Sequence, residues 1–577
     1  MTRRIVRAAA TAGATLLVAA VIIATPTAAF AATRTVTSTS DANVAGTLRF
    51  ELTNAGVGDT ITFGGATFTD LVPDIISLGS SIDIPVGVTI DGPGGGMVNI
   101  VRGGAGNYFL LGLRPTIADQ DYVIEGVTFD GATGTGSAMY ASFNGILGNN
   151  NTARDITLTD VTATNFTAGL GGALATFQTT GSVVIEDSTL SNNHTTLGGA
   201  VSIESPGGTV TIRRNTISLN DATSATGRGG GVYLDNVPGA ISISDTSFLL
   251  NDALQGGGLY LNSVRSAVTI TGSTFSENTA SDAANPAAVA AGGGIYLANT
   301  TDVGASLSVS TTRFTANEAN DAALGFGAGI FVQGVPVLTV RSSTFDQHAF
   351  NGGGGIGLSI GGSVYVTGFI ENSTFDEAGA SGNAIYLSGL ATLGPAPDID
   401  IEHSTIVGPG AVYVETNQSD VDITHTILDG LGAPAVHSDA GAAIGVNWSI
   451  VSSALDADVS DDGNNLFSTA ALLAPLADNG NGAFSRLPGA ASPAREGGDP
   501  AIVAPPALDQ RGAGFARVLG VIDIGALEQG PTAVTGSGPQ LAVSGSDQVW
   551  PTLLLGLFAL FAGLALVGAD RRRRLAA

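Results

Sequence analysis

Two histidines are the residues of this sequence best placed for acid–base or metal chemistry. His403 and His425 are 22 residues apart and occupy equivalent positions in a repeated pattern. Imidazoles so placed can serve as acid and base or as metal ligands. Two histidines without a third ligand do not make a zinc site, however. Equivalent positions elsewhere carry Asp, Arg, Gly, Thr, Ser and Asn, so we expect this column to lie on a solvent-exposed face.

Four aspartates are the candidates for carboxylate chemistry. They alternate with apolar residues in two successive copies of the pattern: Asp398, Asp400, Asp420 and Asp422. Inverting glycoside hydrolysis needs two carboxylates roughly 6.5–9.5 Å apart, and neighbouring strands lie about 4.8 Å apart. Carboxylates on adjacent strands therefore qualify by distance. The alternation nevertheless predicts side chains in solvent, and no G-H-G or N-T-D motif is present, so we assign no catalytic residue.

Two further groups could contact a polysaccharide. Arg213 and Arg214 could supply the base of a lyase, although a surface pair is the simpler interpretation. An aromatic column follows glycine runs at Tyr233, Tyr260, Tyr296, Phe331, Tyr386 and Tyr413. Facing outward, it would be a strip suited to stacking on sugars; facing inward, it would be core. We favour the core, because columns of like residues usually stack inside a solenoid.

Metal and cofactor sites are not indicated. Residues 456–465 carry six acids or amides at loop-like spacing, but they do not meet the EF-hand pattern. An acidic turn is the favoured interpretation, with calcium as the alternative. The sequence has no cysteine, which excludes disulfides and thiolate metal sites. We therefore expect no cofactor and no metal.

These residues lie in or beside a repeat that recurs about nine times between residues 171 and 430. A representative copy, residues 256–278, reads GGGLYLNSVRSAVTITGSTFSEN. Each copy has a large apolar residue in its S-T-F element, 22 to 39 residues from the next. That column is Leu190, Ile217, Phe248, Phe275, Phe314, Phe345, Phe375, Ile406 and Leu428. A repeat of this length indicates a solenoid.

Each copy contains a strand and then a bend. An Ile or Val stands five residues before the large apolar column, usually with another apolar residue two positions earlier. This spacing predicts a strand with one buried face. The following bend carries Ser, Thr or Asn in every copy, and such side chains can satisfy turn backbone groups locally.

Five successive copies carry an asparagine three residues after the apolar column: Asn193, Asn220, Asn251, Asn278 and Asn317. Stacked asparagines can form a hydrogen-bonded ladder, and asparagine tolerates the left-handed backbone of a sharp turn. Without helical periodicity, these columns predict an all-β, right-handed, single-stranded parallel β-helix. A solenoid of this kind needs an N-terminal and a C-terminal cap.

Several motifs resemble known families. F-x-x-N at residues 248–251, 275–278 and 314–317, together with G-G-[AILV], resembles the repeats of polymorphic outer-membrane proteins. Residues 46–63 resemble the opening of large bacterial β-helix surface proteins. Residues 475–528 resemble the end of the choice-of-anchor Q domain, a family of exported bacterial β-helix proteins, although Arg495 and Glu496 depart from its S-P-A-I-D-x-G motif. This resemblance implies no catalytic activity.

The termini have the composition of targeting segments. Residues 1–31 have three arginines, an apolar run and an A-x-A site, which is typical of a secretory signal. Residues 541–577 combine a pentapeptide, an apolar span at 549–568 and four arginines. The pentapeptide is Leu541, Ala542, Val543, Ser544 and Gly545. It resembles a sortase signal of the L-A-x-T-G type, which implies a sortase and cell-wall peptidoglycan as partners. A plain single-span membrane anchor is the alternative.

The remaining segments follow from these boundaries. We expect an N-terminal cap and first coils at 32–110, repeats at 111–430, C-terminal coils and cap at 431–528, and a linker at 529–540. The net charge of −27 disfavours nucleic acid and anionic lipid as partners. We expect a protein anchored at the surface or wall of a Gram-positive bacterium. Its expected function is adhesion or display, with a polysaccharide or a host or neighbouring surface as ligand. The alternative is a polysaccharide lyase or glycoside hydrolase.

Overall fold

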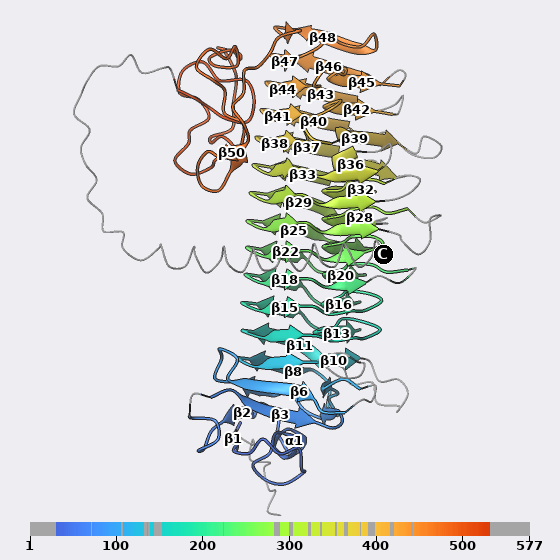
Figure 1. Cartoon of the computed structure of the whole chain (residues 1–577), viewed down its shortest axis with the longest axis vertical. Helices are drawn as coiled ribbons and strands as arrows, with labels where there is room; N and C mark the ends of the chain where they lie inside the picture. The colour runs from blue at the N-terminus through green and yellow to red at the C-terminus, as the bar shows by residue number, and fades with distance from the viewer. Residues whose placement is uncertain are drawn as a thin grey trace, which may run out of the picture.

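The chain forms a straight rod of stacked coils with an irregular unit beside its upper part (Figure 1). A computed structural model describes residues 31–70, 72–104, 108–131, 136, 139–142, 153–222, 224, 226–281, 289–298, 304–320, 325–334, 337–351, 355–362, 367–380, 382–389, 398–415, 420–439 and 442–530. The signal segment up to residue 30, the pentapeptide at 541–545 and the apolar span at 549–568 lie outside the described residues.

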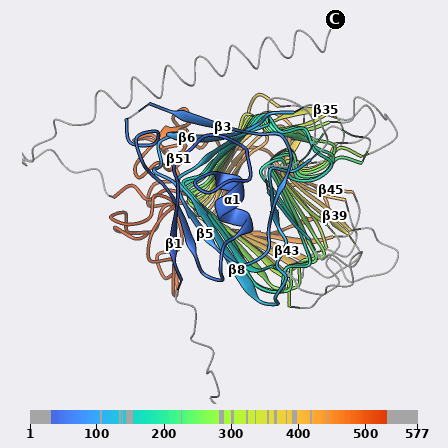
Figure 2. The same cartoon turned by 90° about the horizontal axis from the view of Figure 1, so that it is seen from below.

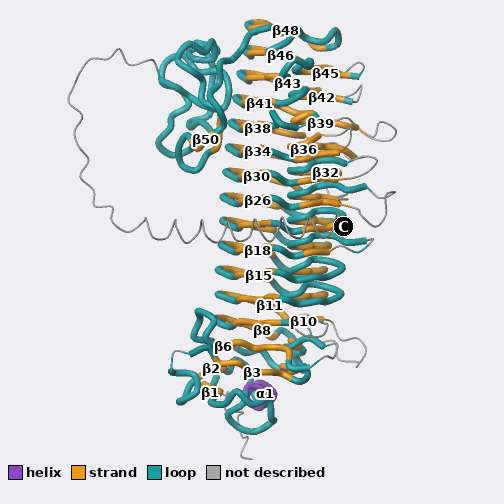
Figure 3. The backbone as a smooth tube through the Cα atoms, viewed as in Figure 1, coloured by secondary structure: helices purple, strands orange, loops and turns teal. Residues whose placement is uncertain are grey.

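Three long parallel sheets form the faces of the rod (Figure 3). Sheet 1 has 16 strands: β1 (Thr33–Val36), β2 (Thr60–Phe63), β5 (Thr89–Asp91), β8 (Gln120–Glu125), β11 (Ala153–Thr159), β14 (Val183–Glu186), β17 (Val210–Arg213), β21 (Ile241–Ser244), β25 (Ala267–Thr271), β29 (Ser306–Ser310), β33 (Val337–Arg341), β37 (Thr367–Glu371), β40 (Asp398–Glu402), β43 (Asp420–Thr424), β46 (Ala443–Asn447) and β48 (Val459–Gly463). Sheet 2 has 13 strands: β4 (Ile82–Ile84), β7 (Leu111–Leu113), β10 (Met139–Ser142), β13 (Leu174–Phe177), β16 (Val201–Glu204), β20 (Val232–Asp235), β24 (Leu259–Asn262), β28 (Ile295–Ala298), β32 (Ile330–Gln333), β36 (Gly355–Gly362), β39 (Asn383–Gly389), β42 (Val412–Val414) and β45 (Val436–Ser438).

Sheet 3 has 15 strands: β3 (Asp74–Leu78), β6 (Val98–Arg102), β9 (Thr128–Asp130), β12 (Thr162–Thr164), β15 (Thr189–Ser191), β18 (Thr216–Ser218), β22 (Ser247–Leu249), β26 (Thr274–Ser276), β30 (Arg313–Thr315), β34 (Thr344–Asp346), β38 (Thr374–Asp376), β41 (Thr405–Val407), β44 (Ile427–Asp429), β47 (Ile450–Val451) and β49 (Leu466–Phe467). A short sheet 4 has five strands: β19 (Asp221–Ala222), β23 (Asp252–Ala253), β27 (Thr279–Ser281), β31 (Glu318–Asn320) and β35 (Ala349–Asn351). Each coil runs from sheet 1 through sheet 3 to sheet 2 and pairs in parallel with the next coil, so the chain is a parallel β-helix, as the repeat predicts.

The core follows directly from the repeat columns. The large apolar residues of sheet 3 are fully buried, and their phenylalanines stack with ring centroids 4.4–5.0 Å apart, as in the pairs Phe248–Phe275, Phe275–Phe314, Phe314–Phe345 and Phe345–Phe375. In sheet 1 the two apolar columns point to the same interior. Each coil therefore buries its side chains mainly against the coils above and below it.

The bend between sheets 1 and 3 has a fixed backbone form. Its first residue has a left-handed conformation, for example Asp187 (φ 52), Arg214 (φ 54) and His403 (φ 48). The next residue is the predicted Ser, Thr or Asn. Its side chain accepts a hydrogen bond from the equivalent backbone N–H one coil earlier, as Asn215 Oδ1 does from Ser188 N at 2.9 Å. The hydroxyls also donate locally, so the polar column satisfies the turn both within a coil and between coils.

The two ends of the rod differ. The helix α1 (Leu48–Thr53) starts at the N-cap Thr47 and buries Leu48 and Leu52 against the first coils. Seen from below, it lies across the opening of the solenoid (Figure 2). At the other end, residues 471–530, the C-terminal unit, have little regular structure beyond the antiparallel pair β50 (Ala477–Asp478) and β51 (Phe484–Ser485). This unit folds back along the flank of the rod (Figure 1).

Candidate functional site

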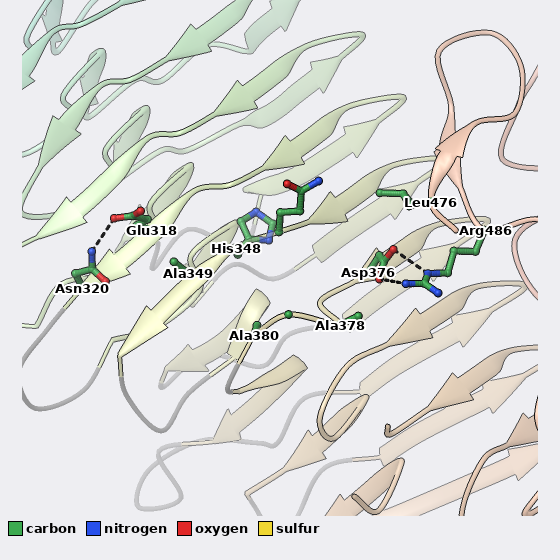
Figure 4. A pocket seen from close by; sticks show the side chains of 11 residues that line it. Glu318, Asn320, His348, Ala349, Asp376, Ala378, Ala380, Leu476 and Arg486 are labelled. Carbon is green, nitrogen blue, oxygen red and sulfur yellow. Dashed lines mark hydrogen bonds and ion pairs between the residues drawn. The ribbon is translucent and has the colours of Figure 1, made fainter. Parts of the chain in front are cut away.

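A groove of about 690 Å³ lies where the C-terminal unit meets the flank of the rod (Figure 4). The rod contributes side chains from β31, from the turn after β34 and from the turn after β38. The C-terminal unit contributes Leu476 and Arg486. The rod residues that line the groove are Glu318, Asn320, Gln347, His348, Ala349, Asp376, Ala378, Gly379 and Ala380.

The groove exists because sheet 4 stops. In the described residues its last strand is β35, and the next coil makes a turn at 377–380 instead of a sixth strand. Ala380 N donates to Glu377 O at 3.0 Å to close that turn. The turn and the first residue of β35, Ala349, contribute only small side chains to the groove, so a shallow floor of alanine and glycine is left between polar walls.

Two buried carboxylates hold the C-terminal wall of the groove. Arg486 Nε and Nη2 each lie 2.8 Å from one oxygen of Asp376. One coil earlier, Arg313 makes two contacts of 3.0 Å with Asp346 and lies 3.6 Å from the ring centroid of Phe484. Fork-like pairs of this kind fix geometry as well as charge. Because both carboxylates are neutralised by arginine, neither is poised to act as a general base.

The asparagine ladder ends beneath the groove. In the ladder, the Nδ2 of each asparagine donates to the Oδ1 of the next at 2.9–3.0 Å, in the pairs Asn193–Asn220, Asn220–Asn251, Asn251–Asn278 and Asn278–Asn317. All five side chains are fully buried. The left-handed residue of this turn is not the asparagine but the residue before it, such as Leu250 (φ 54) or Glu277 (φ 52).

His348 and Glu377 continue the ladder. Asn317 Nδ2 lies 3.4 Å from His348 Nε2, and His348 Nδ1 hydrogen-bonds to Glu377 Oε1. The backbone N–H of His348 donates to Glu377 Oε2 at 3.1 Å. The amide nitrogen Nδ2 of Asn317 can only donate, so His348 Nε2 is the acceptor and His348 Nδ1 carries the proton. Both side chains are 0% exposed, which makes this a structural pair and not an accessible acid–base dyad.

His403 and His425 are not on a solvent-exposed face, so that prediction is wrong. They are 2% and 6% exposed, and their ring centroids lie 5.0 Å apart. The C-terminal unit covers them: Asp499 N donates to His425 Nε2 at 3.1 Å, and Arg517 Nη2 lies 3.2 Å from His403 Nδ1. The same position of the repeat is exposed in coils that the C-terminal unit does not cover, as at Arg214. Groups of three or more potential metal ligands are absent from the described residues.

Burial of the two imidazoles predicts acid sensitivity. Desolvation, followed by the charge of Arg517, lowers the pKa of His403 to about 2 and that of His425 to about 4. A lowered pKa means that the neutral ring stabilises the docked state above the unfolded pKa of about 6.5, and that this contribution is lost as the pH falls toward 4. Burial raises the pKa of Glu528 to about 7 and also raises that of Asp523. Because their pKa values are raised, these two carboxyl groups stabilise the folded state more at low pH than at high pH, which opposes the effect of the histidines.

A comparison of variants isolates the histidine contribution. Asparagine stands at the equivalent position one coil earlier, as Asn372, so we expect H403N/H425N to keep the turn. Thermal unfolding midpoints of the wild type and the double variant should be measured at pH 7 and pH 4.5. We expect the wild type to lose more stability over this interval than the variant. Equal losses would contradict a role for the imidazoles.

The four aspartates lie in register on the outer face of sheet 1. Asp398 pairs with Asp420 and Asp400 with Asp422, while the intervening isoleucines and valine are buried. Burial, followed by the neighbouring carboxylates, raises the pKa of Asp400 and of Asp422. The predicted orientation toward solvent is therefore correct. The arrangement is a crowded acidic surface, with like charges opposite one another.

The aromatic column faces outward, in contrast to the predicted core position. Tyr233 stands between Val232 and Leu234, which point into the main core, and it belongs to a separate cluster on the outside of sheet 2. The rings stack: centroids are 5.6 Å apart for Tyr233–Tyr260 and 5.0 Å for Tyr260–Tyr296. These three tyrosines are 3–6% exposed. Their faces contact one another, so they cannot stack on a sugar.

The remaining candidates have ordinary surface roles. Arg214 contacts Asp187 at 2.6 and 2.7 Å, Arg213 pairs with Glu186, and both arginines are about half exposed. In the acidic turn, Asp461 Oδ1 accepts from Gly463 N at 3.0 Å and from Asn465 Nδ2 at 2.7 Å. These contacts lie within the turn itself.

Comparisons with known proteins support the fold. Residues 116–369 match the family model described as a right-handed beta helix region. No curated protein matches the chain. In the part of the chain that the structure describes, none of the helices has the length and apolarity to cross a membrane. A fold of this kind is found in surface proteins and in proteins that act on polysaccharides, so the specific function must be argued from the geometry.

Proposed function

We propose that this right-handed parallel β-helix protein is a rigid rod on the bacterial surface that serves adhesion or display and performs no catalysis. The observation that carries the proposal is the unbroken stack of sheets 1, 2 and 3, with 16, 13 and 15 strands. At a strand spacing of roughly 4.8 Å, a stack of this size is about 70 Å long. Such a rod places its flanks and its N-terminal end at a distance from its attachment point.

Internal ladders support a rigid rod. The asparagine column and the Ser/Thr/Asn column both run between coils, and each of their bonds ties one coil to the next. Bending the rod would stretch these buried hydrogen bonds, which are costly to leave unmade. Rigidity is a property that a display scaffold needs and that a single small catalytic site does not require.

The tether is proposed from the sequence. The signal segment would direct export, and residues 541–577 would attach the chain to peptidoglycan through a sortase or hold it in the membrane. The chain leaves the C-terminal unit at Gly530, whose carbonyl accepts from Arg495 Nη2 at 2.7 Å. The tether would thus begin on the flank of the rod, with α1 at the far end.

Polysaccharide cleavage is the second candidate, favoured by the in-register aspartates of β40 and β43. Against it, Asp346 and Asp376 beside the groove are paired with arginines, and the aspartate pairs of β40 and β43 stand on an open sheet face. The two functions differ in their products. An enzyme must release new reducing or unsaturated ends.

The test uses cells and purified protein in parallel. The full chain and a chain ending at Gln540 would be expressed in a Gram-positive host that has a sortase. We expect the full chain in the wall fraction, the shortened chain in the medium, and increased adhesion only for cells with the full chain. Purified protein would be incubated with acidic and neutral polysaccharides, with and without calcium. The proposal would be overturned if the full chain were secreted into the medium without attachment to the cell, or if the purified protein released new reducing or unsaturated ends from a polysaccharide.

A further inference from the structure

The groove beside the C-terminal unit is a built site. Its two walls come from parts of the chain about a hundred residues apart: Asp376 and Arg486 are separated by 110 positions. A second link reinforces the first, because Gln510 Nε2 donates to Ser343 O at 3.2 Å and to Thr344 Oγ1 at 3.0 Å. These buried contacts hold the walls at a fixed distance, and a site fixed before binding loses less entropy when a ligand enters.

The floor and the walls differ in chemistry (Figure 4). Ala349, Ala378, Gly379 and Ala380 form a floor without long side chains, and Leu476 adds an apolar side. Polar groups stand at the two ends, Glu318 with Asn320 at one and Arg486 with Asp376 at the other, and His348 lies between them. Glu318 Oε2 accepts from Asn320 Nδ2 at 2.8 Å, which orients both side chains. A ligand with apolar C–H faces and a polar edge fits this arrangement.

Hydroxyl groups suit these ends best. A carboxylate and amide oxygens accept hydrogen bonds, whereas guanidinium and amide nitrogens donate them. A hydroxyl can do both, so a polyhydroxy compound can use either end of the groove. The volume of about 690 Å³ falls within the usual range of small-ligand sites.

Charge selects among polyhydroxy compounds. The chain carries a net charge of −27, and Glu318 adds a negative group inside the groove, so an acidic sugar polymer would be repelled. At the opposite end Arg486 and Asp376 neutralise each other, so that end favours neither sign of charge. We propose, as a refinement that rests on the proposed surface function, that this groove binds a short segment of an uncharged polysaccharide.

The experiment measures sugar binding by the wild type and by variants in which the groove is blocked. The purified protein, without signal segment but otherwise complete, would be titrated by calorimetry with glucose-, mannose-, galactose- and N-acetylglucosamine-based oligosaccharides of three to six units. An oligogalacturonate and an extended alanine-rich peptide would be added as competing classes. We expect one or more neutral oligosaccharides to bind at one site per chain. Binding only to the acidic oligomer or to the peptide, or binding to none of the probes, would overturn the proposal.

Three variants connect binding to the groove. Ala378 is exposed, so A378W should fill the groove without breaking an ion pair, and we expect binding to fall by at least about tenfold. E318Q removes a charged acceptor and should weaken binding by about tenfold. The matched control E277Q lies one coil before Glu318 on the same flank, outside the groove, and should leave binding unchanged. Thermal unfolding would verify that A378W folds, and unchanged affinity in folded A378W would overturn the proposal.

Failure of this site can be told apart from failure of the surface function. Cells that display A378W would be compared with cells that display the wild type in the adhesion assay. If folded A378W loses sugar binding and adhesion together, the groove is the adhesive site. If A378W retains full sugar affinity while cells still adhere, the groove proposal is wrong but the display function stands. Absence of the wild type from the surface would instead overturn the display function.

Discussion

Replacing Asn278 by alanine is expected to lower the free energy of unfolding by about 4 kcal/mol. Asn278 Oδ1 accepts from Asn251 N at 3.1 Å and from Asn251 Nδ2 at 2.9 Å. Its Nδ2 donates to Phe248 O at 2.9 Å and to Asn317 Oδ1 at 3.0 Å. The alanine variant removes all four of these hydrogen bonds from a fully buried place. Asn251 Nδ2 keeps its bond to Ile217 O, and Asn317 Oδ1 keeps the one from the backbone N–H of residue 278. The partners that find no replacement cost about 1–3 kcal/mol each.

The aspartate variant separates hydrogen bonding from packing. N278D keeps the shape of the side chain but places a second acceptor against Phe248 O and Asn317 Oδ1, so we expect a loss at least as large as for N278A. Ser276→Ala, on the outward face of β26 two residues away, is the control and should change stability by less than about 0.5 kcal/mol.

Urea unfolding would give the overall loss for each variant. A solenoid does not always unfold in one step, so hydrogen exchange should also be followed in the coils on either side of β26. We expect protection to fall first in these neighbouring coils. A loss below about 1 kcal/mol for N278A would mean that the ladder contributes little to the stability of the rod.

The repeat could be predicted from the sequence because a solenoid uses local information. Each coil repeats one pattern, so the sheet 3 column and the bend residues fix where strands start and turn. Contacts between coils then follow from register alone: Phe248 meets Phe275 because both hold the same place in their copies. The asparagine ladder has the same origin. In such a fold a column of like residues carries nearly all the information about its neighbours.

The candidate site could not be predicted in this way, because it depends on contacts without a repeat. His403 and Arg517 are 114 residues apart, and Asn372 donates to Leu508 O across 136 residues. No periodicity links the C-terminal unit to the coils it covers. The sequence around His403 and His425 therefore looked like that of exposed positions in the other coils. The groove has the same cause. A signal was present only in the loss of the F-x-x-N motif after Asn317, where His348 takes the place of asparagine.

The tyrosine column was predicted on the wrong face for a different reason. Tyr233 alternates with two aliphatic residues of the same strand, and strict alternation already places it opposite them. The argument that like residues stack inside gave the wrong answer because residues can also stack in register outside a solenoid. The glycines before each strand allow neighbouring backbones to approach closely there: a Cβ on Gly258 would lie 2.7 Å from Gly294 O.

Replacing Glu377 by alanine is expected to cost about 3 kcal/mol, the second large effect. The variant removes the acceptor of both the backbone N–H and the Nδ1–H of His348, in a place where neither side chain of the pair is exposed. His348→Asn is expected to cost less than about 1 kcal/mol. An asparagine can accept from Asn317 Nδ2 and donate to Glu377, so it extends the ladder by one residue.

The contrast between these two variants tests whether the pair ends the ladder or serves chemistry. Glu371→Ala is the control, because it removes a carboxylate from a surface pair, 2.8 Å from Arg341 Nε, and such pairs contribute about 0–1 kcal/mol. Urea midpoints of the three variants would be compared with the wild type. Similar large losses for H348N and E377A would show that the imidazole itself is required, which the ladder does not explain. A loss confined to E377A follows if Glu377 is needed only as the last acceptor of a column that asparagine could continue.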